Sequence, residues 1–402
     1  MSEKSKNNEN KKKKNVKVEE PKFEIGGYIG RLFGRQEEKR AKSHDGGRKR
    51  NKRSHRAEPT DHDDDGTQVE NTDAKAKRKG GKRRTKRMDA AVTAVDDAPK
   101  NVPPGKVAMK EFVANTIKLG VQGILDEFNM IKAQTKNIDG IAKVAFDKHP
   151  DKNRYKDVYC IDADRVVLNY PLGTLNDYIH ANWTGTGDGR RHICTQGPLP
   201  TTIDDFWSMV WQEKIKLIVM LCNCVENTKN KCEQYYPEYV DQEMKSGELS
   251  IKVTQKSDTP NRILTLTTMK ITDGQEEFML HHVQWVNWPD RGVPRETMTC
   301  LRLVQQFKRT SSPVLIHCSA GIGRTGTIVA LDMLYTKLMK GDVVGFQEIV
   351  RELRSHRHGS VQTDVQYLYM HKVIIDIAID RKVVTAEEVR EFNEKYDEKC
   401  KL

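Results

Sequence analysis

The sequence predicts an α/β (α+β) fold in which one central twisted mixed sheet is flanked by helices. Short apolar runs that are typical of buried strands alternate with segments of helical spacing, and tight turns join the strands in the middle of the chain. The excess of basic residues is confined to the first hundred positions. We therefore expect a disordered, basic, low-complexity tail over 1–105, one folded domain over 106–380, and a charged C-terminal helix or tail over 381–402.

The predicted elements follow in chain order. Helical spacing first covers Val107–Lys132, with apolar residues at Phe112, Ile117, Leu119 and Ile124. The predicted strands are Ile193–Thr195, Leu217–Cys222, Ile251–Val253, Ile263–Ile271, Phe278–Trp285 and Val314–His317. Further predicted helices are Ile203–Glu213, Thr297–Lys308, Thr325–Lys340 and Thr363–Ile379. A capping box at Thr385 and Glu388 predicts the start of a final charged helix.

The charge of the chain is distributed unevenly. Residues 1–100 hold 29 Lys and Arg against 18 Asp and Glu, whereas residues 101–402 hold 40 against 39. The first segment has too few apolar residues to offset the entropy cost of ordering. Its basic clusters fit three alternatives: a nuclear import signal, a contact with nucleic acid or an acidic partner, or a solvated linker. Aromatic residues are nearly absent there, so any nucleic-acid binding should be weak and salt-sensitive.

Several classes of protein are disfavoured. The longest strongly apolar run, Leu217–Cys222, is far shorter than the ~20 residues of a membrane helix, so we expect no transmembrane segment. The first residues lack the apolar core of a secretory signal, and eight cysteines without repeated pairs indicate reduced thiols. We expect a cytoplasmic and/or nuclear location. Cys222 and Cys224 resemble half of a metal site, but no second pair lies near in the sequence, so we favour buried thiols and no metal site.

The strongest signal for chemistry is an apolar strand that ends just before Cys318, followed by five uncharged residues and Arg324. Gly321 and Gly323 let the backbone curl so that successive N–H groups form an anion nest. A helix that begins near Thr325 adds the positive end of its dipole, and Arg324 can donate two hydrogen bonds to a phosphate. Cys318 would lie beneath the phosphate, in a field that stabilises a nucleophilic thiolate. The loop residues expected around the phosphate are Ser319, Ala320, Gly321, Ile322 and Gly323.

This segment resembles the signature loop of the cysteine-dependent protein tyrosine phosphatases, and the resemblance covers roughly residues 107–380. Seven other segments resemble motifs of that family, in the family's order: Lys152–Asp157, Asp177–Asn182, Thr195–Pro198, Phe206–Trp211, Lys231–Pro237, Trp288–Pro294 and Val361–Gln366. So many ordered matches are very improbable by chance. The resemblance implies a non-receptor phosphatase with a single catalytic domain and a basic N-terminal extension.

The resemblance also implies a two-step reaction with a cysteinyl-phosphate intermediate. Cys318 would attack the phosphorus, while Asp290 on a mobile loop would protonate the leaving oxygen and later activate water. Gln362 would place that water with help from Gln366, and the hydroxyl of Thr325 would ease departure of the thiolate. No cofactor is implied.

Other residues are assigned supporting roles by the same resemblance. Glu226 matches the position that pairs with Arg324, and His317 ends the strand that carries the nucleophile. Arg354 and Arg357 match positions on a helix behind the loop, where they are either supports for the phosphate site or buried ion-pair partners.

The expected substrates are phosphotyrosine-containing proteins. Tyr155 resembles the ring that walls the pocket, so only a long phosphotyrosine side chain would reach Cys318, and Asp157 resembles the residue that holds the substrate backbone. Lys231 would steer the phosphate or hold Asp290.

Three alternatives remain open. A phosphotyrosine-binding module without turnover is disfavoured because Asp290 and Arg324 are both present. A related enzyme for phosphoinositides or RNA 5′ phosphates is disfavoured because residues 319–323 carry no charge, whereas such loops often carry lysine. The basic tail could also be the main functional part, with nucleic-acid or partner binding as its role.

Overall fold

A computed structural model describes residues 102–400 except for positions 190 and 260. The expectations for the basic tail therefore lie almost wholly outside the described residues. All eight cysteines lie inside that part of the chain, and each is a free thiol.

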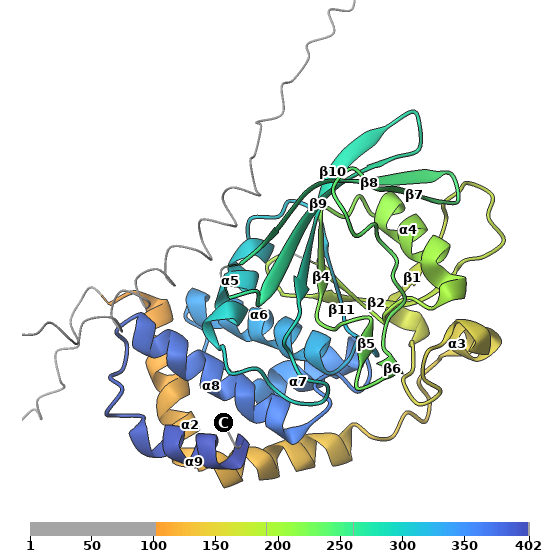
Figure 1. Cartoon of the computed structure of the whole chain (residues 1–402). Helices are drawn as coiled ribbons and strands as arrows, with labels where there is room; N and C mark the ends of the chain where they lie inside the picture. The colour runs from red at the N-terminus through yellow and green to blue at the C-terminus, as the bar shows by residue number, and fades with distance from the viewer. Residues whose placement is uncertain (1–101, 190, 260, 401–402) are drawn as a thin grey trace, which may run out of the picture. The chain divides into compact units, whose positions relative to one another are not determined.

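One sheet forms the centre of the domain (Figure 1). Within the described residues its nine strands are ordered β1-β2-β3-β11-β4-β10-β9-β8-β7. The four neighbours β3, β11, β4 and β10 run parallel, and antiparallel pairs complete both sides. The predicted mixed sheet is confirmed. The strands are β1 (Arg165–Val167), β2 (Tyr178–Gly185), β3 (Arg191–Thr195), β4 (Leu217–Met220), β7 (Glu243–Ser246), β8 (Leu249–Asp258), β9 (Leu264–Thr272), β10 (Glu277–Trp285) and β11 (Val314–His317).

The residue composition of the central strands explains their position. β4 and β11 are buried along their whole length, as expected for parallel strands covered on both faces. β8 and β9 instead alternate between buried and partly exposed residues where the first half of β8 pairs with the second half of β9. A separate two-stranded ribbon consists of β5 (Val225–Glu226) and β6 (Lys229–Asn230), and it carries one residue expected at the site.

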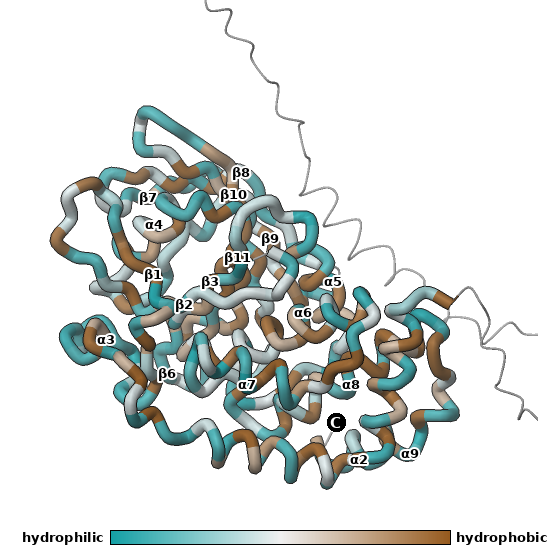
Figure 2. Tube along the Cα trace, turned by 180° about the vertical axis from the view of Figure 1, so that it is seen from behind, coloured by the Kyte–Doolittle hydropathy of each residue, from teal (hydrophilic) through white to brown (hydrophobic). Residues whose placement is uncertain are grey.

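Helices cover the two faces of the sheet unequally. Figure 1 shows α5, α6 and α8 together on one side and α4 on the other. Apolar stretches gather in the middle of the domain around β3, β11 and α6, as Figure 2 shows from behind. The helices are α2 (Pro104–Gln134), α3 (Val144–Lys148), α4 (Ile203–Gln212), α5 (Met298–Phe307), α6 (Arg324–Lys340), α7 (Phe346–His356), α8 (Asp364–Asp380) and α9 (Arg390–Cys400). Short 3-10 turns cover Pro150–Lys152, Asp162–Asp164 and Pro200–Thr202.

The first helix differs from its predicted regular pattern. Gly120 in α2 has φ 63° and ψ 176°, which interrupts the helical backbone. The residues after Gly120 therefore do not continue the face set by the residues before it. Phe112 and Ile124 are buried, but Ile117 and Leu119 just before the interruption are 40% and 43% exposed. The helix predicted over Val107–Lys132 is confirmed by α2, but its backbone is interrupted at Gly120.

Two C-terminal helices were missed or misplaced by spacing alone. α7 begins after Gly345, whose N–H donates to Glu348 Oε2 at 3.1 Å. The N-cap position is therefore occupied by a glycine instead of the more usual Ser, Thr, Asp or Asn, which weakens the sequence signal for a helix start. The box at Thr385 does form, with its N–H 2.6 Å from Glu388 Oε2, but it closes a turn and α9 begins later. Phe392 and Tyr396 of α9 are buried in the same core as the sheet.

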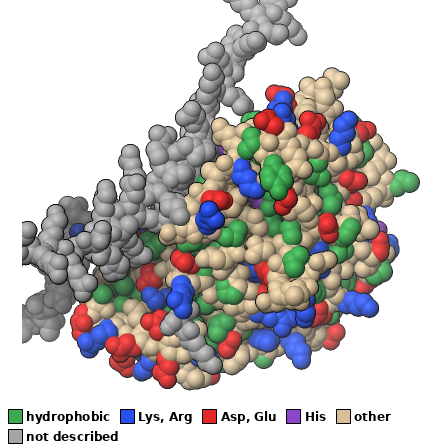
Figure 3. All heavy atoms as spheres, viewed as in Figure 1, with side chains coloured by type: hydrophobic (Ala, Val, Ile, Leu, Met, Phe, Trp, Pro, Cys, Tyr) green, Lys and Arg blue, Asp and Glu red, His purple; other side chains and the backbone are tan. Residues whose placement is uncertain are grey.

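Within the described residues, no helix combines the length and the apolar character needed to cross a membrane. On the face drawn in Figure 3, acidic and basic side chains are interspersed. This mixture agrees with the near balance of charges in residues 101–402.

Candidate active site

The centre of the site is the loop between the end of β11 and the start of α6. Cys318 follows the strand directly and is 4% exposed. The N–H of Gly321 donates to Cys318 Sγ at 3.2 Å, so the loop turns back over the sulfur. α6 begins at Arg324, and the unpaired N–H groups and positive dipole end of its first turn add to an anion site.

Gly321 is required by the geometry of this loop. Its φ is +70°, and a Cβ atom would lie 2.1 Å from the carbonyl oxygen of Thr195 on β3. A side chain there would both strain the backbone and force the loop away from the sheet.

Arg324 is held by a two-pronged ion pair. Its Nη1 and Nη2 donate to Glu226 Oε1 and Oε2 at 2.6 and 2.8 Å, and Nη1 also donates to the carbonyl of Trp288 at 3.0 Å. Burial alone would lower the pKa of Arg324, but the hydrogen bonds with Glu226 outweigh it and raise the pKa. Glu226 therefore fixes the guanidinium plane, as the resemblance implied.

Asp290 contacts both Arg324 and Lys231. Its Oδ2 lies 2.5 Å from Lys231 Nζ, and its Oδ1 lies 3.3 Å from Arg324 Nη2. Partial burial acts to raise the pKa of Asp290, but the hydrogen bond from Lys231 and the charge of Arg324 outweigh it and lower the pKa. Of the two roles expected for Lys231, the structure shows the contact with Asp290.

One wall of the site is a chain of hydroxyl groups. Ser319 Oγ donates to the carbonyl of Lys231 at 2.8 Å, and its other partner is the hydroxyl of Tyr155, also at 2.8 Å. Since the serine proton is already used, Tyr155 is the donor in the second bond. The phenol of Tyr155 is thereby hydrogen-bonded to the residue that follows Cys318, whereas Asp157 in the same segment is exposed.

The glutamines lie at the opposite side of the loop. A Cβ atom on Gly323 would meet Gln362 Oε1 and Gln366 Nε2, each at 3.2 Å, so both amides reach the loop. Gln366 Oε1 also accepts from the N–H groups of Gln362 and Thr363, at 3.1 and 3.3 Å. Gln366 is therefore held rigidly at the start of α8, while Gln362 is only partly buried.

Arg357 supports the loop from behind. Its Nε and Nη2 donate to the carbonyls of Gly321 and Ala320 at 3.2 and 3.0 Å, and Nη1 donates to Asn182 Oδ1 at 2.8 Å. These bonds turn the loop carbonyls away from the anion site, which leaves the N–H groups to face it.

Among the described residues, Arg354 hydrogen-bonds to the segment that precedes Gln362 and not to the loop. It donates to the carbonyls of Ser360 and Val361 at 2.9 and 2.8 Å, and burial lowers its pKa to about 10. It thus positions the segment that carries Gln362. Within the described residues neither Arg354 nor Arg357 pairs with a carboxylate.

His317 is fully buried at the end of β11. Its Nδ1 lies 3.3 Å from the carbonyl of Cys318, and its Nε2 lies 2.7 Å from the hydroxyl of Tyr235. A carbonyl only accepts, so Nδ1 carries the proton and Nε2 accepts from Tyr235. His282 Nε2 lies 2.8 Å from the same hydroxyl and completes the chain. Burial lowers the pKa of His317 to about 4, so the ring is neutral.

Two loop positions complete the set. Thr325 is fully buried, and its hydroxyl has no hydrogen-bond partner among the described residues, so its proton is available at the start of α6. Ile322 is buried, and its carbonyl accepts from the N–H of Val361 at 2.9 Å, which ties the loop to the glutamine segment.

These contacts bring Glu226 and Asp290 to Arg324, Lys231 to Asp290, and Tyr155 to Ser319, while Gln362 and Gln366 lie beside Gly323. Asp157 is exposed, and Arg354 contacts the segment before Gln362 instead of the loop. Spacing did not single out Tyr235, Trp288 as a carbonyl partner of Arg324, or Asn182. All three lie inside segments that matched family motifs, so the resemblance pointed to these positions. The chemistry of their side chains alone did not indicate a role at the site.

Comparisons with known proteins agree with this geometry. A family model described as "Protein-tyrosine phosphatase" matches residues 149–376. Receptor-type tyrosine-protein phosphatase eta from Gallus gallus is 34% identical over 312 residues, which are 74% of this chain and 22% of that protein. Tyrosine-protein phosphatase non-receptor type 18 from Mus musculus is 37% identical over 238 residues, which are 56% of this chain and 52% of that protein.

A solved structure of the catalytic domain of human non-receptor type 18 phosphatase aligns with a TM-score of 0.60 at 32% identity, covering 67% of this chain and 99% of that one. The chain spans about a fifth of the length of the receptor-type relatives that it matches. From the matched family, the ordered motifs and the shared fold, this chain belongs to the protein-tyrosine phosphatase family.

Proposed function

We propose that this chain hydrolyses phosphotyrosine on proteins by a two-step cysteinyl-phosphate mechanism. The observation that carries the proposal is the convergence of Cys318, the Arg324–Glu226 pair and Asp290 on one loop. An anion bound by the loop amides and Arg324 would sit directly over the sulfur, with the acid beside it.

In the first step the Cys318 thiolate attacks phosphorus, and the bond from phosphorus to the tyrosine oxygen breaks. Asp290 transfers its proton to that oxygen, so tyrosine leaves as a neutral phenol. The phosphate dianion attracts Arg324 and Lys231, which weakens their hold on Asp290 and favours its protonated form.

In the second step water attacks the phosphocysteine. Asp290 takes a proton from the water, the bond from sulfur to phosphorus breaks, and inorganic phosphate leaves. Gln362, whose amide reaches the loop, would orient the water, and the unpartnered hydroxyl of Thr325 would donate to the departing thiolate.

The restriction to phosphotyrosine rests on the depth of the sulfur. Cys318 is 4% exposed, and Tyr155 is fixed beside it through Ser319. A phosphoserine side chain is shorter than phosphotyrosine, so we expect it not to bring its phosphorus to a sulfur that is so fully buried. Solved complexes of the type 18 phosphatase with HER2 phosphopeptides concern that protein, and they support the same substrate class for this chain.

A panel of matched peptides that carry phosphotyrosine, phosphoserine or phosphothreonine tests the proposal. The wild-type chain should release phosphate from phosphotyrosine peptides alone, and Cys318→Ser should bind those peptides without turnover. Equal rates on all three peptides would overturn the substrate class. Binding without turnover by the wild type would instead show a phosphotyrosine-binding module.

A further inference from the structure

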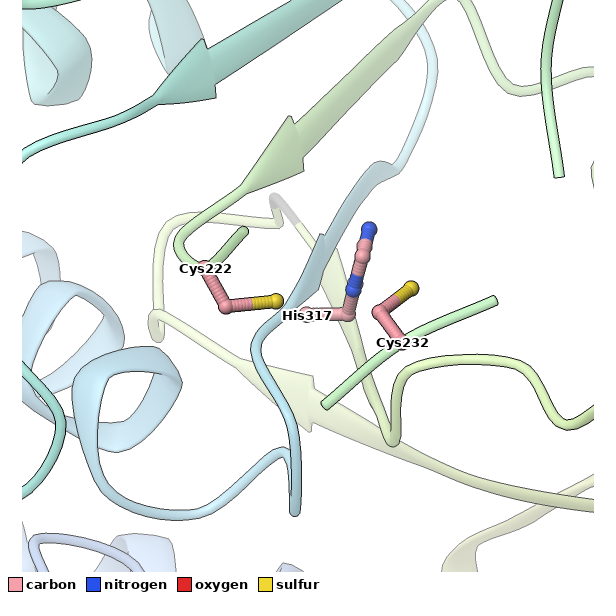
Figure 4. A group of neighbouring side chains, drawn as sticks. All are labelled: Cys222, Cys232 and His317. Atoms are coloured by element: carbon pink, nitrogen blue, oxygen red, sulfur yellow. The ribbon is translucent and has the colours of Figure 1, made fainter. Parts of the chain in front are cut away.

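Three metal-ligand groups meet behind the phosphate loop. Cys222 Sγ, Cys232 Sγ and a ring nitrogen of His317 lie within 4.8 Å of one another, and all three residues are buried. Figure 4 shows the three side chains converging from separate segments. The group is independent of the residues assigned to the chemical steps, and the sequence separated its members by up to 95 positions.

The fold explains this meeting. β4 and β11 are parallel neighbours with Met220 opposite His317, and the N–H of Leu221 donates to the carbonyl of His317 at 2.8 Å. Cys222 therefore lies just beyond the end of β4, beside the end of β11. The N–H of Cys232 donates to the carbonyl of Cys224 at 3.3 Å, which returns the chain to the same place after the β5–β6 ribbon.

The chemistry of the group fits a soft cation. Thiolates and a neutral imidazole are ligands that Zn²⁺ prefers, and structural zinc sites are almost always tetrahedral. Two thiolates would also balance the two positive charges in a buried place. Cys224 is not among the three mutually close groups, but its thiol interacts with that of Cys232, so Cys224 or water is the candidate for the fourth position.

We propose that Cys222, Cys232 and His317 form a binding site for a thiophilic divalent cation such as Zn²⁺, with Cys224 or water as the fourth ligand. Binding releases the two thiol protons to solvent, which leaves two thiolates on the cation.

Occupancy of this site should inhibit the phosphatase. A cation on Nε2 of His317 must displace the hydrogen bond from Tyr235, and a cation on Nδ1 must displace the bond to the Cys318 carbonyl. Either change disturbs the residue that precedes the nucleophile. Cys232 also follows Lys231, so the same event reaches the partner of Asp290.

The test uses Co²⁺ as a spectroscopic probe on the full chain, kept reduced by a phosphine. One equivalent of Co²⁺ should give a thiolate-to-metal absorption band that one equivalent of Zn²⁺ abolishes. Cys222→Ala and Cys232→Ser should each lose the band, whereas Cys318→Ser should keep it. The matched control is Cys300→Ser, a buried thiol 3.3 Å from the hydroxyl of Tyr369, which should also keep the band.

Thermal unfolding without metal identifies variants that fail to fold, and either cysteine variant that folds is decisive. A wild-type chain without the band, or a folded Cys222→Ala chain that keeps it, would overturn the site. A band lost only in Cys318→Ser would place the cation on the nucleophile instead.

Inhibition is measured separately with an aryl phosphate. Zn²⁺ should slow the wild-type chain, EDTA should restore its rate, and Cys222→Ala should resist the same Zn²⁺ concentration. Equal inhibition of both chains would overturn the inhibitory role. Because the absorption band does not depend on turnover, the metal site and the phosphatase function fail independently.

Discussion

Lys231 Nζ lies 2.5 Å from Asp290 Oδ2, so the residue that we propose as the acid is held as a carboxylate in this conformation. Lys231 and Arg324 together lower the pKa of Asp290 against the opposing effect of burial. In the proposed mechanism this contact makes the acid step depend on the phosphate, because a bound dianion would compete with the carboxylate for both cations.

Replacing Lys231 by methionine should raise the pKa of Asp290 because one cation is removed. The acid must be protonated in the first step, so the basic limb of kcat/KM should move to higher pH. The measurement is kcat/KM against pH with one aryl phosphate for both chains. Lys270→Met, at an exposed pair with Glu277 on the sheet, is the matched control and should leave the limb in place. A limb that stays fixed or moves to lower pH in Lys231→Met would contradict the role of this pair.

Asp290→Asn should slow turnover by about 10²–10⁴-fold, the usual contribution of a general acid. Asparagine preserves the shape of the side chain but has no proton to donate. The loss should shrink as the leaving group becomes more acidic, because such a group departs without protonation. Steady-state rates over a series of aryl phosphates check this, and an equal loss for every leaving group would argue against acid catalysis.

Glu226→Gln should weaken phosphate binding by removing the charge that orients Arg324. Hydrogen bonds to charged groups contribute roughly 1.5–3 kcal/mol, which corresponds to about a 10- to 150-fold loss in kcat/KM. Competitive inhibition by inorganic phosphate should weaken in parallel. Unchanged phosphate inhibition in a folded variant would show that Arg324 does not need this partner.

Gly321→Ala should abolish activity and lower the melting temperature, because its Cβ would lie 2.1 Å from the Thr195 carbonyl at a positive φ. Gly274→Ala is the matched control: its φ is +91°, but no atom lies within 4 Å of the added carbon. In that variant only the backbone strain, about 1–2 kcal/mol, should be lost from the free energy of unfolding, and the activity should remain. Similar melting temperatures and activities for the two variants would contradict the role of close packing at Gly321.

The strand and the helix on either side of the Cys318 loop were predicted closely, whereas β1, β2 and β7 were not predicted. β11 was placed to the residue, and α6 differs from its prediction only at its first residue, because apolar runs and glycines leave little freedom there. The regular pattern over α2 failed because a single glycine, Gly120, changes the helical phase. Spacing carries no information about such a local φ.

The sequence also did not predict contacts between segments that are distant along the chain. The motif that holds Lys231 also holds Cys232, but only the fold shows that Cys232 meets Cys222 and His317. The roles of Arg354 and Arg357 could not be separated in the sequence for the same reason, because both lie near the end of one helix. Their carbonyl partners, at Val361 and Gly321, come from different loops.

Acid quenching of the chain during turnover of a phosphotyrosine peptide, followed by mass analysis of its fragments, tests the central claim most directly. We predict one phosphoryl group on the fragment that contains Cys318, bound to sulfur and absent from Cys318→Ser. A chain that turns over without any covalent phosphoryl group, or that carries it on another residue, would contradict the cysteinyl-phosphate mechanism.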